Sequence, residues 1–461
     1  MEHKIYKRYP IGNKRFIWKQ KDFILSTFSG FPQMGTQEGD IDVVADRYAK
    51  HHKEAGFNLM ELGWVDHEGS WAAVEACENN GIDLVFQDMS IMGGMTSRHL
   101  ERKVSREVIK SVVDRLKDKK HTIGYYVWDE PQCEEQMTEA RRQMDILQEL
   151  DPEALLFTVA DPDYNRNPAK KDALGNPTGL PGDSWENGRY VPYIHEFAEK
   201  MDPPVMSFDY YPVGDYFGVW PGHKYSYENQ LDDSFMLLSM APINDVAKKH
   251  DLPFWFYYQG YKLFECTKKE DFIFPMVRCF MYSAVLYGAK GLQNYATGEK
   301  GNRFLNPDGS KGDFFEDQKQ INYELKNLGN TLMALDSKLI IHSSDLLSGC
   351  EYTKPYFNSV EESLIFAEEL PKRTSVGELE DKYGNRYAVI LNRDYEKVST
   401  INLKLKDSFR VYEVSKEDGK QRIILDSASQ LTLTLQPGDA VLYRFQKASD
   451  TPFTCEYELA E

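Results

Sequence analysis

The sequence predicts a (β/α)8 barrel over residues 1–335, an antiparallel β-sandwich over residues 340–446 and a tail over residues 447–461. Up to about residue 300, short apolar segments alternate with amphipathic helical patterns. After residue 340, apolar and polar residues alternate strictly, as on strands with one buried face. The 461 residues fit one barrel of roughly 250 residues or more and a smaller second domain.

The first half of the barrel is expected to contain four strands with helices between them. Gly56 and Gly81 each stand between a helical pattern and an apolar segment, where glycine commonly ends a helix. The expected strands are 23–28, 57–62, 82–86 and 122–128, and the helices begin at Asp42, at Ser70 and near Val108.

The second half repeats this order. The expected helices are 137–150, 193–201, 234–250 and 272–287, and the strands that follow them are 154–159, 204–209, 253–258 and 291–295. Strands that are apolar on both faces and joined by helices pair in parallel, which favours a closed barrel. A doubly wound open sheet is the alternative, but no glycine-rich phosphate loop follows the first strand.

The C-terminal region shows a period of two. Leucines at 431, 433 and 435 alternate with threonines at 432 and 434, and the segment 441–445 alternates in the same way. Asp418-Gly419 is a typical hairpin turn. These features predict an antiparallel sandwich of about 100 residues.

Charge and composition exclude several classes of partner. The 73 acidic and 55 basic side chains give a net charge of −18, which disfavours binding to nucleic acid or to an anionic membrane surface. No segment approaches the roughly 18 apolar residues that a membrane helix requires. The six cysteines form no CxxC pair, which excludes a zinc ribbon and a disulfide scaffold. Neither His51-His52 nor Asp66-His67-Glu68 has zinc-ligand spacing, so these histidines and acids are interpreted as helix-surface or loop residues. No metal or cofactor is expected.

The N-terminal segment MEHKIYKRYPIGNKRF contains no apolar stretch of the kind found in secretory signals. We expect a cytoplasmic protein from the chain as written. A periplasmic or secreted location applies if a signal peptide was removed.

Two adjacent carboxylates follow the aromatic fourth strand. Asp129 and Glu130 come directly after Trp128, and Pro131 ends the strand. Active sites of these barrels lie at the carboxyl ends of the strands. A carboxyl group beside aromatic rings has a raised pKa, as a general acid requires, whereas the simpler interpretation is a cap on the next helix.

Other strand ends carry amides, acids and aromatic side chains. This combination suits a neutral, polyhydroxylated ligand, because amides and acids bind hydroxyl groups and aromatic rings stack on sugar rings. We therefore expect an oligosaccharide substrate. The candidate binding residues are Glu61, Trp64, Gln87, Asp88, Trp128, Tyr210, Tyr211, Trp220, Gln259, Gln293 and Asn294.

Four segments in order resemble a known family. They are YYVWDEP at 125–131, SFDYYP at 207–212, PFW at 253–255 and LYGAKGLQ at 286–293. Over residues 20–446 the chain resembles Bacteroidetes glycoside hydrolases with a clan A, family 42-like barrel and a C-terminal β-sandwich. The resemblance implies hydrolysis of a glycosidic bond with Glu130 as the acid/base, because that clan places this glutamate at the end of strand four.

The chain departs from the clan at strand seven, where Gln259 stands in the place of the nucleophilic glutamate. Glu265 falls in the following loop, so Asp209 is expected to be the second carboxylate. Adjacent Asp129 and Glu130 also resemble substrate-assisted hexosaminidases, in which the aspartate orients the acetamido group of the substrate and a tyrosine, here Tyr210 or Tyr211, supports it. A non-catalytic carbohydrate-binding barrel and a barrel enzyme of another class, such as a lyase or isomerase, are the remaining alternatives.

Overall fold

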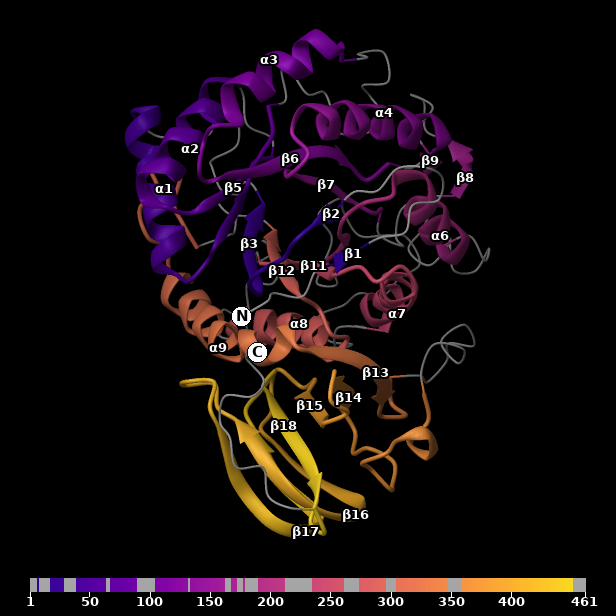
Figure 1. Ribbon diagram of the computed structural model, residues 1–461. Coiled ribbons are helices and arrows are strands. Elements are labelled where there is room, and N and C mark those ends of the chain that lie inside the picture. Colours follow the sequence, from indigo (N-terminus) through magenta and orange to yellow (C-terminus); the bar gives the residue numbers. More distant parts are fainter. Residues whose placement is uncertain are drawn as a thin grey trace.

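The computed structural model describes two folded regions, a barrel in the upper part of Figure 1 and a β-sandwich below it. Among the helices described, none combines the length and apolar character that crossing a bilayer requires. The described residues are 6–7, 17–28, 39–63, 67–88, 104–131, 133–161, 167–171, 177–178, 190–211, 234–260, 273–295, 304–346 and 358–450.

Eight parallel strands form the barrel, in the order β10-β11-β12-β3-β4-β5-β6-β7. The two ends of this sheet meet where the Ala160 amide donates to the Ser207 carbonyl at 2.8 Å. The barrel prediction is confirmed, and each strand overlaps the segment expected for it. The strands are β3 (Ile24–Phe28), β4 (Leu59–Glu61), β5 (Asp83–Phe86), β6 (Thr122–Asp129), β7 (Leu155–Val159), β10 (Met206–Tyr210), β11 (Phe254–Gln259) and β12 (Gly291–Tyr295).

Helices surround the strands as an outer layer (Figure 1). Asp40 caps the first of them, because its carboxylate accepts the Asp42 amide at 3.1 Å. Gly56 and Gly81 have φ values of 86° and 64°, as expected for residues that end helices. The helices are α1 (Ile41–Glu54), α2 (His67–Asn80), α3 (Arg106–Leu116), α4 (Glu134–Leu150), α6 (Tyr190–Met201), α7 (Ser234–Lys249), α8 (Ile273–Leu286) and α9 (Phe315–Met333).

Two short antiparallel pairs accompany the barrel. The first joins β1 (Tyr6–Lys7) to β2 (Ile17–Trp18), and the second joins β8 (Asn167–Lys171) to β9 (Pro177–Thr178).

Aromatic rings fill much of the barrel interior. Trp255 Nε1 donates to Gln20 Oε1 at 2.9 Å, so the indole N–H has a hydrogen-bond acceptor inside the apolar core. Gly291 pairs with Trp255 on the neighbouring strand, and a Cβ atom at Gly291 would lie 2.6 Å from the indole ring. The interior cluster comprises Ile24, Phe28, Leu59, Val85, Tyr126, Leu155, Phe157, Val159, Val205, Trp255 and Tyr257.

The second region is one continuous antiparallel sheet in the order β13-β14-β15-β18-β16-β17. β16 changes register with β17 at several points, and bulges of this kind let long strands bend from one layer into the other. Both layers enclose one apolar core, so the sandwich prediction is confirmed. The strands are β13 (Leu335–His342), β14 (Thr374–Asp381), β15 (Arg386–Asn392), β16 (Ser399–Val414), β17 (Gln421–Leu435) and β18 (Ala440–Lys447), with a 3-10 helix at Val360–Glu362.

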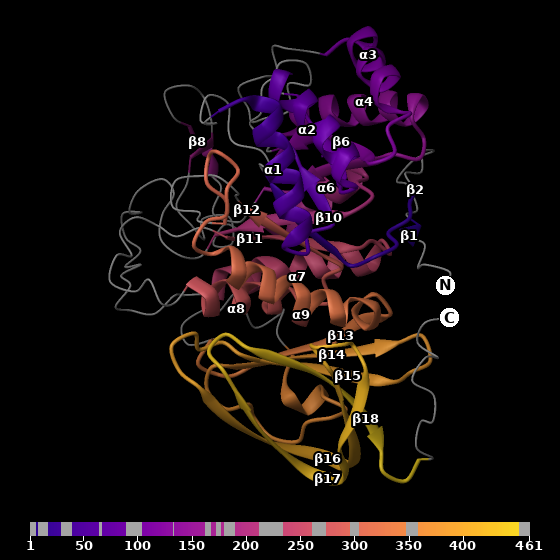
Figure 2. The ribbon, with the colours of Figure 1, turned by 90° about the vertical axis from the view of Figure 1, so that its left-hand side faces the viewer.

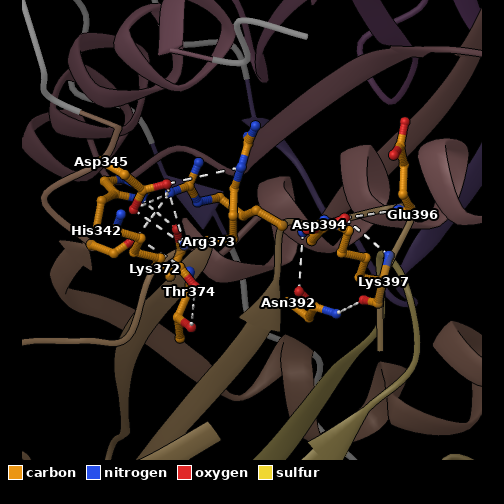
Figure 3. A network of polar contacts seen from close by, with 12 residues as sticks. His342, Asp345, Lys372, Arg373, Thr374, Asn392, Asp394, Glu396 and Lys397 are labelled. Carbon is orange, nitrogen blue, oxygen red and sulfur yellow. Dashed lines mark hydrogen bonds and ion pairs between the residues drawn. The ribbon is translucent and has the colours of Figure 1, made fainter. Parts of the chain in front are cut away.

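Carboxylates stabilise the turns at one end of this sheet (Figure 3). Asp345 accepts the backbone amide of Arg373 at 3.1 Å, where Arg373 has a left-handed φ of 58°. Asp394 accepts the amides of Glu396 and Lys397 at 2.9 and 3.0 Å. These contacts are typical of turns that polar side chains hold in place, and we assign this network a structural role.

The sandwich lies against α8 and α9 of the barrel (Figure 2). Only Ala334 separates α9 from β13, so β-structure begins at Leu335 rather than near residue 340. A Cβ atom at Gly377 would lie 2.1 Å from the Leu286 carbonyl oxygen, which shows how closely β14 passes the end of α8. Arg278 on α8 donates to the Pro437 carbonyl at 3.0 Å.

We expect Gly291→Ala to destabilise the protein by about 1–3 kcal/mol, because the added methyl group must displace the buried Trp255 ring. Urea unfolding measures this change. Gly384→Ala is the control: Gly384 has a positive φ of 81° but no neighbouring atom within 4 Å, so only backbone strain is added there. A Gly291→Ala variant as stable as the wild type would contradict the packing argument.

Candidate active site

β6 contains a β-bulge close to its end. Tyr126 lies opposite Phe157 on β7, and Trp128 lies opposite Thr158, so Val127 has no partner of its own. An extra residue in one strand reverses the face to which the following side chains point.

The bulge turns Asp129 toward the barrel interior. Asp129 pairs with Val159, an interior residue, and Tyr126 Oη donates to Asp129 Oδ1 at 2.8 Å. Regular alternation from Tyr126 would instead have placed Trp128 and Glu130 inside. The ring of Trp128 is 1% exposed and packs in the core between strands and helices.

The side chain of Glu130 lies on the same side as Asp129 because of its backbone conformation. Its φ is 45°, a left-handed conformation that costs a non-glycine residue roughly 1–2 kcal/mol. In this conformation Glu130 forms a hydrogen bond with the side chain of Asp209 on β10. The two adjacent carboxyl groups of β6 therefore both lie close to Asp209.

Burial raises the pKa of Asp209 to about 8, and the nearby charge of Asp129 adds to this effect. Hydrogen bonds with Tyr211 and Glu130 act in the opposite direction, and Asp161 raises the pKa further. The carboxyl of Asp209 thus retains a proton at neutral pH within a group of acidic side chains. Such a group can deliver or accept a proton.

Aromatic rings flank this acidic group. Tyr211 stacks on Tyr295 with ring centroids 4.8 Å apart and an interplanar angle of 24°. Phe28 lies 5.5 Å from the Tyr295 ring, in the interior cluster. Tyr210, the neighbour of Tyr211, points the other way and packs in the core between strands and helices.

A second buried carboxyl group lies in the barrel interior. Ser26 Oγ and Tyr257 Oη donate to Glu61, and Gln293 Nε2 donates to its two oxygens at 2.8 and 3.0 Å. Ser207 Oγ donates to Gln293 Oε1 at 2.7 Å. Burial raises the pKa of Glu61 to about 7, although these hydrogen bonds lower it. Glu61 and Gln293 thus bind each other, and a substrate role for them stays a prediction.

Gln87 is the expected binding residue with the clearest unmet bonding capacity. It follows β5 two residues after the interior residue Val85, so alternation places it inside the barrel. Gln87 is 1% exposed, and neither its amide nitrogen nor its amide oxygen has a hydrogen-bond partner. One oxygen of Asp209 has no partner either. Buried polar groups left in this state indicate a place for a ligand or water.

Asp88 points away from the interior and contacts His67 at the start of α2. The two are joined by a hydrogen bond of 2.6 Å from His67 Nδ1 to a carboxylate that is fully buried. The sequence predicted a helix from Ser70 and a surface or loop histidine, which missed this pair. Recognising that the helix begins at His67, directly after strand two, would have placed His67 at this end of the barrel.

Of the remaining candidate residues, some are described by the structure and others lie outside the described ranges. Gln259 is buried at the end of β11, opposite Tyr295, in the strand-seven position discussed above. Asn294 Nδ2 donates to Tyr258 Oη at 3.2 Å and to Gln318 Oε1 at 3.1 Å, among the helices. Trp64, Trp220 and Glu265 lie outside the described residues.

Within the described ranges, no three acidic, histidine or cysteine side chains are grouped as a metal ion would require.

Comparison with known proteins supports the fold. No protein-family model and no curated protein matches the chain. A solved structure described as a glycoside hydrolase is 14% identical, with a TM-score of 0.51 and 94% of each chain covered. A glycoside hydrolase family 5 structure from Bacteroides vulgatus ATCC 8482 is 13% identical, with a TM-score of 0.54, covering 94% of this chain and 91% of the other. At these identities the likeness establishes a shared barrel-and-sandwich fold.

We expect Asp209→Asn to stabilise the protein increasingly as pH rises from 4 to 8. The folded protein keeps the Asp209 proton up to about pH 8, whereas the unfolded chain releases it near pH 4. The folded state binds more protons in this window, so the wild-type free energy of unfolding falls with pH, and the variant loses this dependence. The gain at pH 8 should reach at least about 1 kcal/mol, measured by urea unfolding across the pH range.

The control is Asp308→Asn, because Ser310 and then Arg47 lower the pKa of that half-buried carboxyl. Its effect should stay constant between pH 4 and 8. A constant effect for Asp209→Asn as well would contradict a retained proton.

Proposed function

We propose that this protein is a glycoside hydrolase that cleaves a glycosidic bond in an oligosaccharide, with Glu130 as the general acid. The observation that carries the proposal is the meeting of Asp129, Glu130 and Asp209 at the carboxyl end of the barrel, where burial raises the pKa of Asp209 and favours a bound proton. Hydrolysis of a glycosidic bond requires such a proton on the leaving oxygen. The two solved structures of like fold carry the name glycoside hydrolase, which agrees with this proposal.

Asp209 is proposed as the second carboxylate. In the ligand-free state it is hydrogen-bonded to Glu130, so the two groups share a proton. Retaining glycosidases hold their two carboxyl groups roughly 5–5.5 Å apart and inverting ones roughly 6.5–9.5 Å apart. In this proposal, a sugar that enters between Glu130 and Asp209 separates the pair, and the reaction requires the proton on Glu130 and the charge on Asp209.

The same contact favours a second candidate, substrate-assisted hydrolysis. If the pair stays together in the complex, neither group can act from the opposite face of the sugar. Asp129, held by Tyr126, would then orient the acetamido group of an N-acetylhexosaminide, and Glu130 would still act as the acid. The two mechanisms differ in which aspartate is essential.

Substrate recognition is proposed to involve Gln87 and Tyr211. The unpartnered amide of Gln87 offers an NH2 group that donates and an oxygen that accepts, and together they can bind two neighbouring hydroxyl groups of a sugar. Tyr211, stacked on Tyr295, lies beside Asp209 and supplies an aromatic surface.

Glu130→Gln tests the proposed acid. We expect hydrolysis of an oligosaccharide to fall by about 100-fold or more, because its leaving oxygen needs protonation. A dinitrophenyl glycoside of the same sugar should lose much less, since its leaving group needs little protonation. Steady-state kinetics on both substrates measure the difference. Glu134→Gln is the control, because Glu134 is 73% exposed and pairs with Lys200 at the start of α4.

Full activity of Glu130→Gln on an oligosaccharide would exclude Glu130 as the acid. Loss of activity in Asp129→Asn but not in Asp209→Asn, on an N-acetylhexosaminide, would establish the substrate-assisted mechanism. Sugar binding without turnover at any pH would point to a non-catalytic binding protein. Activity of another class on sugars would point to a lyase or isomerase.

Gln87→Met should separate binding from stability. Removal of two unpartnered amide atoms should raise the free energy of unfolding by about 1 kcal/mol, whereas kcat/KM should fall about 10-fold or more. The control is Gln318→Met, because Gln318 is equally buried but bonded to Asn294 and Asn322 at 3.1 and 2.8 Å. That variant should lose stability. Lower stability in Gln87→Met would contradict a ligand-binding role for Gln87.

A further inference from the structure

The turn that follows β6 is strained and needs support from outside the strand. Glu130 adopts a left-handed φ of 45°, and Pro131 follows it without an amide hydrogen. A residue in this conformation persists only where neighbouring contacts hold it. The source of that support decides where the Glu130 carboxyl points.

Tyr193 on α6 supplies two hydrogen bonds to this region. Its hydroxyl donates to the Pro131 carbonyl at 3.0 Å and accepts the Asp161 amide at 2.8 Å. Pro131 directly follows Glu130, and Asp161 lies just beyond the end of β7. One phenol group therefore joins the ends of two neighbouring barrel strands on either side of the acidic group.

The phenol stays protonated and can donate at every working pH. Burial raises the pKa of Tyr193 well above its usual value, and the charges of Asp161 and Glu130 raise it further. The influence of Glu130 also indicates that its carboxyl lies near this hydroxyl. The ring of Tyr193 packs beside Phe197 on the same helix, with centroids 6.3 Å apart, which fixes the position of the hydroxyl.

We propose that Tyr193 is a positioning residue that holds Glu130 in its left-handed conformation and so directs the acid toward Asp209. The inference rests on the proposed function of Glu130 as the acid, and it goes beyond that function by assigning the support of the acid to a helix distant in sequence. Tyr193 acts through the backbone of Pro131 and does not itself need to contact the substrate.

Tyr190 provides a matched control on the same helix. Its hydroxyl donates to the Ser239 carbonyl at 3.3 Å and so joins α6 to α7. Tyr190→Phe and Tyr193→Phe thus each remove a hydrogen bond from a buried tyrosine hydroxyl to a backbone carbonyl. Only the second change affects the turn that carries Glu130.

The kinetic experiment compares Tyr193→Phe with Glu130→Gln on substrates of different leaving groups. We expect Tyr193→Phe to lower kcat on an unmodified oligosaccharide by about 10- to 100-fold with little change in KM, because the Glu130 carboxyl no longer lies where it can protonate the leaving oxygen. On the dinitrophenyl glycoside the loss should be less than about 3-fold. Tyr190→Phe should lower both activities equally or not at all.

A structural measurement completes the test without any substrate. In a crystal structure of Tyr193→Phe, residue 130 should leave the left-handed region and its contact with Asp209 should be lost. An unchanged conformation at residue 130, or equal losses on both substrates, would overturn the role of Tyr193. If Glu130→Gln itself shows no dependence on the leaving group, the proposed function fails, and the structural result alone then decides whether Tyr193 supports the turn.

Discussion

The extra residue in β6, Val127, determines which side chains reach the carboxyl of Asp209. Without it, Asp129 would point into the helical layer, and the indole of Trp128 would occupy the interior. The bulge lies where the strand leaves the sheet, so it redirects side chains without breaking the ladder that closes the barrel. The candidate active site depends on this single irregularity in an otherwise regular fold.

The aromatic interior of the barrel gives the carboxyl groups their chemistry. Rings of Phe28, Tyr126, Phe157 and Tyr257 exclude water from the space beneath the acidic group. A medium of low polarity disfavours charge, so carboxyl groups there keep their protons to higher pH. Glu61 shows that the same interior also accepts an acid when hydroxyl and amide donors surround it. The two carboxyl groups therefore differ in how many of their bonding positions the protein itself fills: donors reach both oxygens of Glu61, whereas one oxygen of Asp209 has no hydrogen-bond partner.

Much of this arrangement could be predicted from the sequence, since short apolar segments between helical patterns located all eight strands of the barrel. Asp129, Glu130 and Asp209 were selected from their places at strand ends, and the structure brings these three residues to the same end of the barrel, whereas their catalytic roles stay predictions. The bulge could not be predicted, because a strand that is apolar on both faces has no alternation of polar and apolar residues for an inserted residue to interrupt. Tyr193 and His67 were missed for a related reason: each acts through a contact between elements far apart in the chain, and neither belongs to a strand end. Trp128 was assigned to substrate binding from its position beside two acids, whereas its ring packs among the helices.

The junction between the two domains has a mechanical consequence. α9 is followed by β13 after Ala334 alone, and residues of the sandwich such as Tyr387 and Leu442 belong to the same apolar cluster as the barrel helices. A hinge requires a few residues whose backbone can rotate freely, and this connection contains no such segment. The sandwich is therefore expected to move together with α8 and α9 as one rigid unit and to stabilise both helices.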